Sequence, residues 1–163
     1  MLKISMLCAR PLIVALLCLA AGLAAGPAPA AAKSIAEARE IVVGETMRYL
    51  NVPYLWGGMH PDTGIDCSAF VQLVYHKADL SVPRVARDQY SASYHLAPEA
   101  VLPGDLLFFS MKNPGGLRAD HVGIYVGKGF FVHASVTNGI HIDSVTNQYY
   151  YQRLISARKY RGF

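Results

Sequence analysis

The stretch Gly64-Ile65-Asp66-Cys67-Ser68-Ala69-Phe70 decides the fold, because it places a cysteine at the start of a helix. Apolar residues then recur at helical spacing and predict a helix from Cys67 to about Ala78. Asp66 is a good N-cap, which puts Cys67 at the first helical position. There the free backbone N–H groups and the helix dipole favour a thiolate. Cys67 is therefore predicted to be a nucleophile, with a buried structural cysteine as the alternative.

Residues 1–32 have the pattern of a secretory signal peptide. The segment begins with a positively charged end, continues in an apolar run from Pro11 to Ala25, and offers small residues for cleavage before Lys33. An uncleaved anchor helix is the alternative, but it needs about 20 apolar residues, more than the strongly apolar part of this run provides. The exported domain is expected to comprise residues 33–163.

Two further cysteines, Cys8 and Cys18, lie inside the predicted signal, and their neighbours do not fit a lipidation site. Cys67 would then be the only cysteine of the exported chain, without an internal partner for a disulfide. The 163 residues less 32 leave 131, enough for one domain. Without Lys3 and Arg10, the 15 basic residues fall to 13 against 11 acidic ones, which gives no reason to expect nucleic-acid binding.

Aromatic and basic side chains flank the cysteine in sequence. Tyr54 and Trp56 lie in a segment rich in Gly and Pro, where aromatic rings either plug the core or line a cleft. The hydroxyl of Tyr54 favours the cleft for that residue. Arg84 and Arg87 could bind a substrate carboxylate, although arginines in such positions are more often simply solvated.

Two strands further along the chain carry histidines. Residues 121–126 and 130–134 are separated by Gly-Lys-Gly at 127–129, which predicts a hairpin. A three-residue turn would place the apolar residues of both strands on one face, with Val126 opposite Phe130, Ile124 opposite Val132 and Val122 opposite Ala134. In this register His133 lies opposite Gly123 and His121 lies opposite Ser135, so the two histidines are diagonal neighbours about 7–8 Å apart at the backbone.

A thiol at a helix start with a histidine on a facing sheet is the nucleophile–base pair of cysteine hydrolases. We expect His121 to accept the Cys67 proton, giving a thiolate–imidazolium pair, and His133 to orient His121. The backbone N–H of Cys67, with Tyr54 as a second donor, would stabilise the oxyanion.

The chain resembles the NlpC family of bacterial cell-wall peptidases, which are papain-related cysteine enzymes. The resemblance covers roughly residues 38–159 and depends on five motifs in the family's order. These are Tyr54-x-Trp56-Gly57-Gly58, Gly64-x-Asp66-Cys67-Ser68, Pro103-Gly104-Asp105, His121-Val122-Gly123-Ile124-Tyr125 and Phe131-x-His133-Ala134-Ser135.

The resemblance implies an α+β, papain-like fold in which the nucleophile helix packs on a central antiparallel sheet. It implies a Cys67-His121-His133 triad that hydrolyses bonds in peptidoglycan stem peptides or cross-links, usually the bond from γ-D-glutamate to the diamino acid. Substrate or oxyanion contacts are expected from Tyr54, Trp56, Asp66, Ser68 and Arg84. We expect no cofactor, no metal and no membrane anchor after cleavage. The exported protein is expected to be a monomer in the periplasm or at the cell wall. A protein that regulates or targets it is a possible partner.

Two residues depart from the family pattern: Ala69 replaces a common glycine, and Asp120 precedes the base. The Asp120 carboxylate is hypothesised to raise the His121 pKa. The alternative functions are an acyltransferase or amidase of related fold, a Cys-His-His metal site and a non-catalytic wall-binding domain.

Overall fold

The computed structural model describes residues 33–163, so the predicted signal peptide lies outside the described residues. No helix in this described part is both long enough and apolar enough to span a bilayer. The helices are α1 (Ile35–Arg48), α2 (Cys67–Lys77), α3 (Ala86–Ser91), the short 3-10 turn η1 (Pro98–Ala100) and α4 (Gln148–Tyr151). The strands are β1 (Met59–His60), β2 (Gly64–Ile65), β3 (Ser93–His95), β4 (Leu106–Phe109), β5 (His121–Gly127), β6 (Phe130–Ser135), β7 (Gly139–Ser144) and β8 (Leu154–Tyr160).

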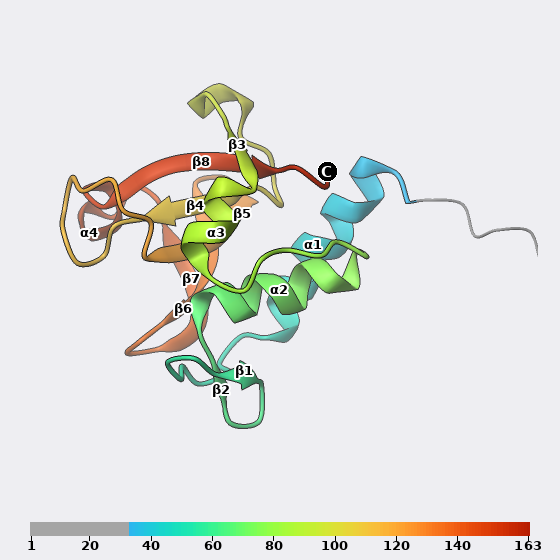
Figure 1. Cartoon of the computed structure of the whole chain (residues 1–163), viewed down its shortest axis with the longest axis horizontal. Helices are drawn as coiled ribbons and strands as arrows, with labels where there is room; N and C mark the ends of the chain where they lie inside the picture. The colour runs from blue at the N-terminus through green and yellow to red at the C-terminus, as the bar shows by residue number, and fades with distance from the viewer. Residues whose placement is uncertain (1–32) are drawn as a thin grey trace, which may run out of the picture. The chain divides into compact units, whose positions relative to one another are not determined.

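A six-stranded sheet forms the centre of the domain, with the strands in the order β3-β8-β4-β5-β6-β7. Every neighbouring pair is antiparallel, as the sequence predicts. β1 and β2 form a separate two-stranded pair that leads into the start of α2 (Figure 1). This arrangement confirms the predicted α+β class with a central antiparallel sheet.

Helix α2 lies beside α1 and packs on β5 and β6 (Figure 1). Its side chains Phe70, Val71 and Val74 are fully buried in one cluster with Val122 and Val132 of the sheet. The opposite face of the sheet carries a smaller cluster, formed by Leu107, Phe109, Phe131 and Tyr150. The alternation of side chains along β5 and β6 therefore places Val122, Ile124, Val132 and Ala134 under α2. Both histidines lie on the other face, together with Phe131.

The β5–β6 hairpin confirms one part of the predicted register and corrects another. His133 pairs with Gly123, and Ile124 pairs with Val132, as predicted. The predicted pairing of Val126 with Phe130 is wrong, because Phe130 pairs with Gly127 and a bulge lies between residues 125 and 127.

The turn of this hairpin contains two residues instead of the predicted three. Lys128 and Gly129 form it with φ of 53° and 79°, the left-handed values that a type I′ turn requires. A two-residue turn alone would shift the register by one position, and the bulge adds the residue that restores it. The histidines consequently keep the face that the three-residue turn predicted.

At the other end of the hairpin, β5 and β6 stop pairing at Gly123 and His133. The predicted oppositions of Val122 with Ala134 and of His121 with Ser135 do not belong to the ladder. The Val122 backbone N–H instead lies close enough to Cys67 to favour its thiolate. The separation of the strands thus exposes β5 backbone to the start of α2, beside His121.

Candidate active site

Helix α2 begins at Cys67, and its N-cap is Asp66, as predicted. One oxygen of the Asp66 carboxylate accepts hydrogen bonds from the Ala69 backbone N–H at 2.8 Å and from the Ser68 hydroxyl at 3.1 Å. Arg84 donates to both carboxylate oxygens, at 2.9 and 2.7 Å, and to the Ser68 hydroxyl at 3.0 Å. This network fixes the first turn of the helix and thereby the position of Cys67.

Both terminal nitrogens of the Arg84 guanidinium group are therefore hydrogen-bonded to Asp66. Burial alone would raise the pKa of Asp66, but the hydrogen bonds from Arg84 and Ala69 and the charge of Arg84 outweigh it and lower the pKa. Direct binding of substrate by Asp66, Ser68 and Arg84 remains a prediction. The contacts give these three side chains a positioning role around the cysteine.

The Cys67 thiol is free and buried, with only 7% of the residue exposed. Burial raises its pKa to about 11, although the backbone N–H groups of Val122, Ser68 and Cys67 itself oppose the change. The raised pKa contradicts the expectation of a resting thiolate. Loss of hydration destabilises the buried thiolate more than the backbone N–H groups at the helix N-terminus stabilise it.

The two histidines predicted to act together lie in direct contact. His121 Nε2 is 2.8 Å from His133 Nδ1, and the two rings are perpendicular, at 88°. His133 is almost fully buried, at 1% exposure, and His121 is buried at 8%. Gly123 makes this possible, because an added Cβ there would lie 2.7 Å from the Phe131 ring and 3.1 Å from His133 Cβ.

A carboxylate that sequence reasoning missed extends this pair. Asp143 Oδ2 lies 3.0 Å from His133 Nε2 and 2.8 Å from His141 Nε2. Burial alone would raise the Asp143 pKa, but the hydrogen bond from His133 and the neighbouring Tyr150 hydroxyl outweigh it and lower the pKa. Alternation along Ile140-His141-Ile142-Asp143 was the available signal, since it places His141 and Asp143 on the face opposite the two isoleucines.

The chain of contacts from Asp143 fixes which ring nitrogens carry protons. A carboxylate only accepts hydrogen bonds, so His133 Nε2 is the donor and His133 Nδ1 carries a lone pair. That lone pair accepts from His121 Nε2–H. His121 Nδ1 is then left as the unprotonated nitrogen, able to accept a proton from a thiol.

Both histidines are neutral at rest. Burial lowers the pKa of His121 well below its ordinary value, and the neighbouring His133 lowers it further. Burial also lowers the pKa of His133 to about 4, although the hydrogen bond that His133 donates to Asp143 opposes this change. The hypothesis that Asp120 raises the His121 pKa is wrong, because the Asp120 carboxylate is directed to the backbone N–H groups of Met111 and Lys112, with the shorter contact at 2.6 Å.

The two aromatic residues before the cysteine differ in their surroundings. Tyr54 forms a bridge with Ile65 and is partly buried against the core near Cys67. Burial raises its pKa to about 12, and the nearby Cys67 and Asp66 contribute to this shift. Trp56 is 80% exposed, which excludes the possibility that it plugs the core. Its contact with substrate remains a prediction.

The Cys67-His121-His133 combination is not a preformed metal site. In the described part of the chain, the one group of three metal-binding side chains with mutually close ligand atoms is His133, His141 and Asp143. Three other histidines, His60, His76 and His95, are exposed.

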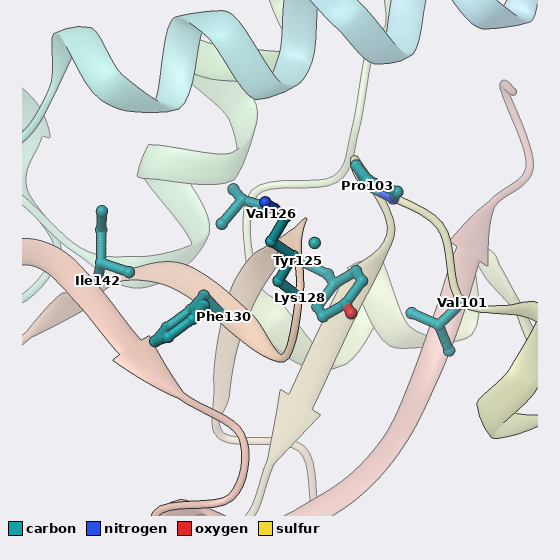
Figure 2. A pocket seen from close by; sticks show the side chains of 8 residues that line it. Val101, Pro103, Tyr125, Val126, Lys128, Phe130 and Ile142 are labelled. Carbon is teal, nitrogen blue, oxygen red and sulfur yellow. The ribbon is translucent and has the colours of Figure 1, made fainter.

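A hollow of about 710 Å³ lies at the turn end of the β5–β6 hairpin, away from the histidines. Figure 2 shows Phe130 and Ile142 on one side of it and Val101 and Pro103 on the other. His121 is at the opposite end of β5. The hollow therefore does not belong to the candidate active site.

Comparison with known proteins identifies relatives of this domain. Residues 51–159 match the sequence model of the NlpC/P60 family. The chain is 37% identical over 117 residues to the bifunctional muramidase/DL-endopeptidase CwlT of Bacillus subtilis, which covers 72% of this chain and 35% of that protein. It is 34% identical over 133 residues to the murein DD-endopeptidase MepH of Escherichia coli, which covers 77% of this chain and 47% of that protein.

The chain thus spans about a third to a half of the length of these curated relatives. Among solved structures, an NLP/P60 family protein of Staphylococcus aureus, described as similar to a lipoprotein, superposes with a TM-score of 0.70 and 34% identity. The match covers 82% of this chain and 44% of that chain. This likeness confirms the predicted papain-like arrangement.

Proposed function

Because the chain belongs to the NlpC/P60 family, we propose that it is a cysteine peptidase that cleaves peptide bonds in peptidoglycan. The observation that carries the proposal is the hydrogen-bonded chain Asp143–His133–His121, which ends one residue before Val122, the residue whose backbone N–H lies close to the buried Cys67 thiol. A wall-binding domain without catalysis would not require a base whose protonation is fixed by two consecutive contacts. The catalytic residues in this proposal are Cys67, His121 and His133.

The first step transfers the Cys67 proton to His121 Nδ1 as the sulfur attacks the carbonyl carbon of the substrate. The raised thiol pKa of about 11 and the lowered His121 pKa both favour the neutral pair before substrate binds. Proton transfer therefore accompanies the attack. The imidazolium formed on His121 donates Nε2–H to His133, which is held in turn by the negative charge of Asp143.

The oxyanion that forms on attack needs hydrogen-bond donors. We assign the backbone N–H of Cys67, at the open start of α2, as the first donor. The Tyr54 hydroxyl is the second, and its raised pKa of about 12 keeps it protonated and able to donate at neutral pH. Collapse of the intermediate moves the His121 proton to the leaving amine and forms a thioester with Cys67. Water, with His121 as base, then hydrolyses the thioester.

The substrate class comes from the relatives. One is named a DL-endopeptidase and the other a murein DD-endopeptidase, and both names describe cleavage of peptide bonds that contain D-amino acids. We assign stem peptides or cross-links of peptidoglycan as the substrate of this chain, and the exposed Trp56 side chain as an apolar contact for it. Arg84, Asp66 and Ser68 would act by positioning the helix start.

The location and partners follow from the same proposal. Peptidoglycan lies outside the cytoplasmic membrane, so residues 1–32 would serve as the export signal and be removed before Lys33. The exported domain of residues 33–163 would work as a monomer in the periplasm or at the cell wall. A protein partner could supply targeting or restraint.

Digestion of purified sacculi tests the proposal. Wild-type protein should release muropeptides that mass spectrometry identifies by the bond cut, and Cys67→Ala should release none. His76→Ala, a change at an exposed residue of the same helix, serves as the matched control and should leave the products unchanged. Equal product release by wild type and Cys67→Ala, or no product from any sacculus, would overturn the proposal.

A further inference from the structure

His141 is the one member of the histidine–aspartate cluster that the proposed mechanism does not use. It lies on β7 opposite His133, and its side chain is 24% exposed. His141 Nδ1 is 3.3 Å from the Gly139 carbonyl oxygen, and Nε2 is 2.8 Å from Asp143 Oδ2. Both ring nitrogens therefore face oxygens that accept hydrogen bonds.

A neutral imidazole cannot satisfy both contacts. When Nδ1–H donates to the Gly139 carbonyl, Nε2 presents a lone pair to a carboxylate oxygen. Two acceptors at 2.8 Å repel each other, so this contact needs either a proton on His141 Nε2 or a metal ion that both groups bind. In the neutral ring a proton on Nε2 removes the donor from Nδ1, whereas a metal ion on Nε2 leaves Nδ1–H free to donate to Gly139.

The surroundings match those of a metal site. His133 Nε2, His141 Nε2 and an Asp143 oxygen all lie within 4.8 Å of one another. Two imidazoles and one carboxylate form a set that binds zinc with a fourth position left for water. In zinc sites the second ring nitrogen of each histidine is held by a backbone carbonyl or another polar group, and here Gly139 and His121 hold them.

We propose that His133, His141 and Asp143 bind a divalent transition-metal ion such as Zn²⁺, and that the bound ion reversibly inactivates the enzyme. Zinc bonds of about 2.0–2.2 Å require ligand atoms roughly 3.3 Å apart, so Asp143 Oδ2 must withdraw by a few tenths of an ångström. Asp143 and His141 are partly exposed, at 20% and 24%, which gives the ion a path from solvent.

Inactivation follows from the protons on the histidines, and this part of the proposal depends on the proposed function. A metal on His133 Nε2 takes the lone pair that this nitrogen must provide, so the ring carries its proton on Nδ1 instead. His133 then donates to His121 Nε2, and His121 carries its own proton on Nδ1. Each imidazole keeps one proton on the other nitrogen, and His121 no longer has a lone pair for the Cys67 thiol.

Calorimetric titration with Zn²⁺ tests the binding step without reference to activity. We expect one ion per chain for wild type and Cys67→Ala, with dissociation constants within about twofold of each other. His141→Gln should weaken binding at least about tenfold. His60→Gln is the matched control, because His60 forms an exposed pair with Asp62 at 3.5 Å and should leave zinc binding unchanged.

Substitution with Co²⁺ and alkylation provide independent readouts. Bound Co²⁺ should lack the sulfur-to-cobalt charge-transfer band that a Cys67 ligand would produce. Zn²⁺ should slow alkylation of Cys67 by iodoacetamide in wild type and not in His141→Gln, and a chelator should restore the rate. Alkylation reads the base directly, so it separates failure of the metal proposal from failure of the peptidase proposal.

Zinc binding that survives His141→Gln and disappears in Cys67→Ala would overturn the proposal, as would absence of stoichiometric binding by wild type. If His141→Gln does not fold, zinc-soaked wild-type crystals decide the matter. An anomalous peak between His133, His141 and Asp143 supports the site. A peak at Cys67, or none, refutes it.

Discussion

Asp143→Asn is expected to slow catalysis, although the proposed mechanism gives Asp143 a role only through its contact with His133. The variant keeps the shape of the side chain but can present an amide N–H to His133 Nε2, which favours the wrong tautomer. The contact that it replaces, at 3.0 Å, is a hydrogen bond to an ionised carboxylate. Such bonds contribute about 1.5–3 kcal/mol. Loss of this preference for the active tautomer of His133 therefore predicts a fall in kcat of about 10- to 150-fold.

The change of tautomer at His133 should also change the tautomer of His121, because a single 2.8 Å hydrogen bond joins the two rings. KM should change little, since the thiol and the first turn of α2 lie outside the substituted contact. Release of soluble muropeptides, measured under metal-free conditions with a chelator present, gives both constants. Asp62→Asn is the matched control, because Asp62 forms an exposed pair with His60 at 3.5 Å.

A positioning role also predicts a change in pH dependence. In Asp143→Asn the imidazolium of His121 loses a negative charge two contacts away, so the acid limb of kcat/KM should move to lower pH. Activity within about twofold of wild type, with an unchanged pH profile, would refute the tautomer reasoning. A parallel loss of activity and of cooperative unfolding would also refute it, since a fold defect would then explain the result.

Two further predictions concern stability and packing. Lowering the pH from 7 to 5 should reduce the free energy of unfolding by about 2 kcal/mol through His133 alone. The pKa of His133 is about 4 in the folded state and about 6.5 in the unfolded state, so the unfolded state binds more protons in this pH range. His121 adds to this loss in the same direction, and urea unfolding of wild type and His133→Gln should show a weaker pH dependence for the variant. Gly123→Ala should cost about 1–3 kcal/mol in the same assay and lower activity, because its Cβ would meet the Phe131 ring at 2.7 Å and displace His133. Gly44→Ala, in open space within α1, should not destabilise the protein; equal losses from both changes would contradict the packing argument.

Local sequence was sufficient to predict the start of α2 and the facing histidines. An N-cap acts on residues two or three positions away, and the alternation of a strand assigns side chains to faces without knowledge of its neighbours. Asp143 was missed because its role depends on the pairing of β7 with β6, which no local pattern specifies. The bulge near Val126 was missed for a related reason, since the three-residue turn and the bulged two-residue turn give the same faces.

Burial explains the error in the predicted charge of Cys67. The helix start and its N–H groups are local features, and both favour the thiolate. Loss of hydration depends on how Val122 and the rest of the core close around the sulfur, and this non-local effect is the larger one. The sequence thus places the proposed nucleophile at the helix start, while local features alone favour the wrong protonation state for it.

A neutral Cys67–His121 pair also affects how fast the Cys67 thiol is oxidised or alkylated. Oxidants and alkylating reagents react with the thiolate, so a buried thiol with a pKa of about 11 reacts slowly with them at neutral pH. The same burial lowers the pKa of His121, so the base does not protonate before substrate arrives. In the proposed mechanism, activation must then come from the transition state, where the oxyanion donors and the Asp143–His133 contact would stabilise charges that the resting site lacks. The Asp143–His133 contact would thus be in place for the charges of the reaction, while burial favours an uncharged Cys67 and His121 between turnovers.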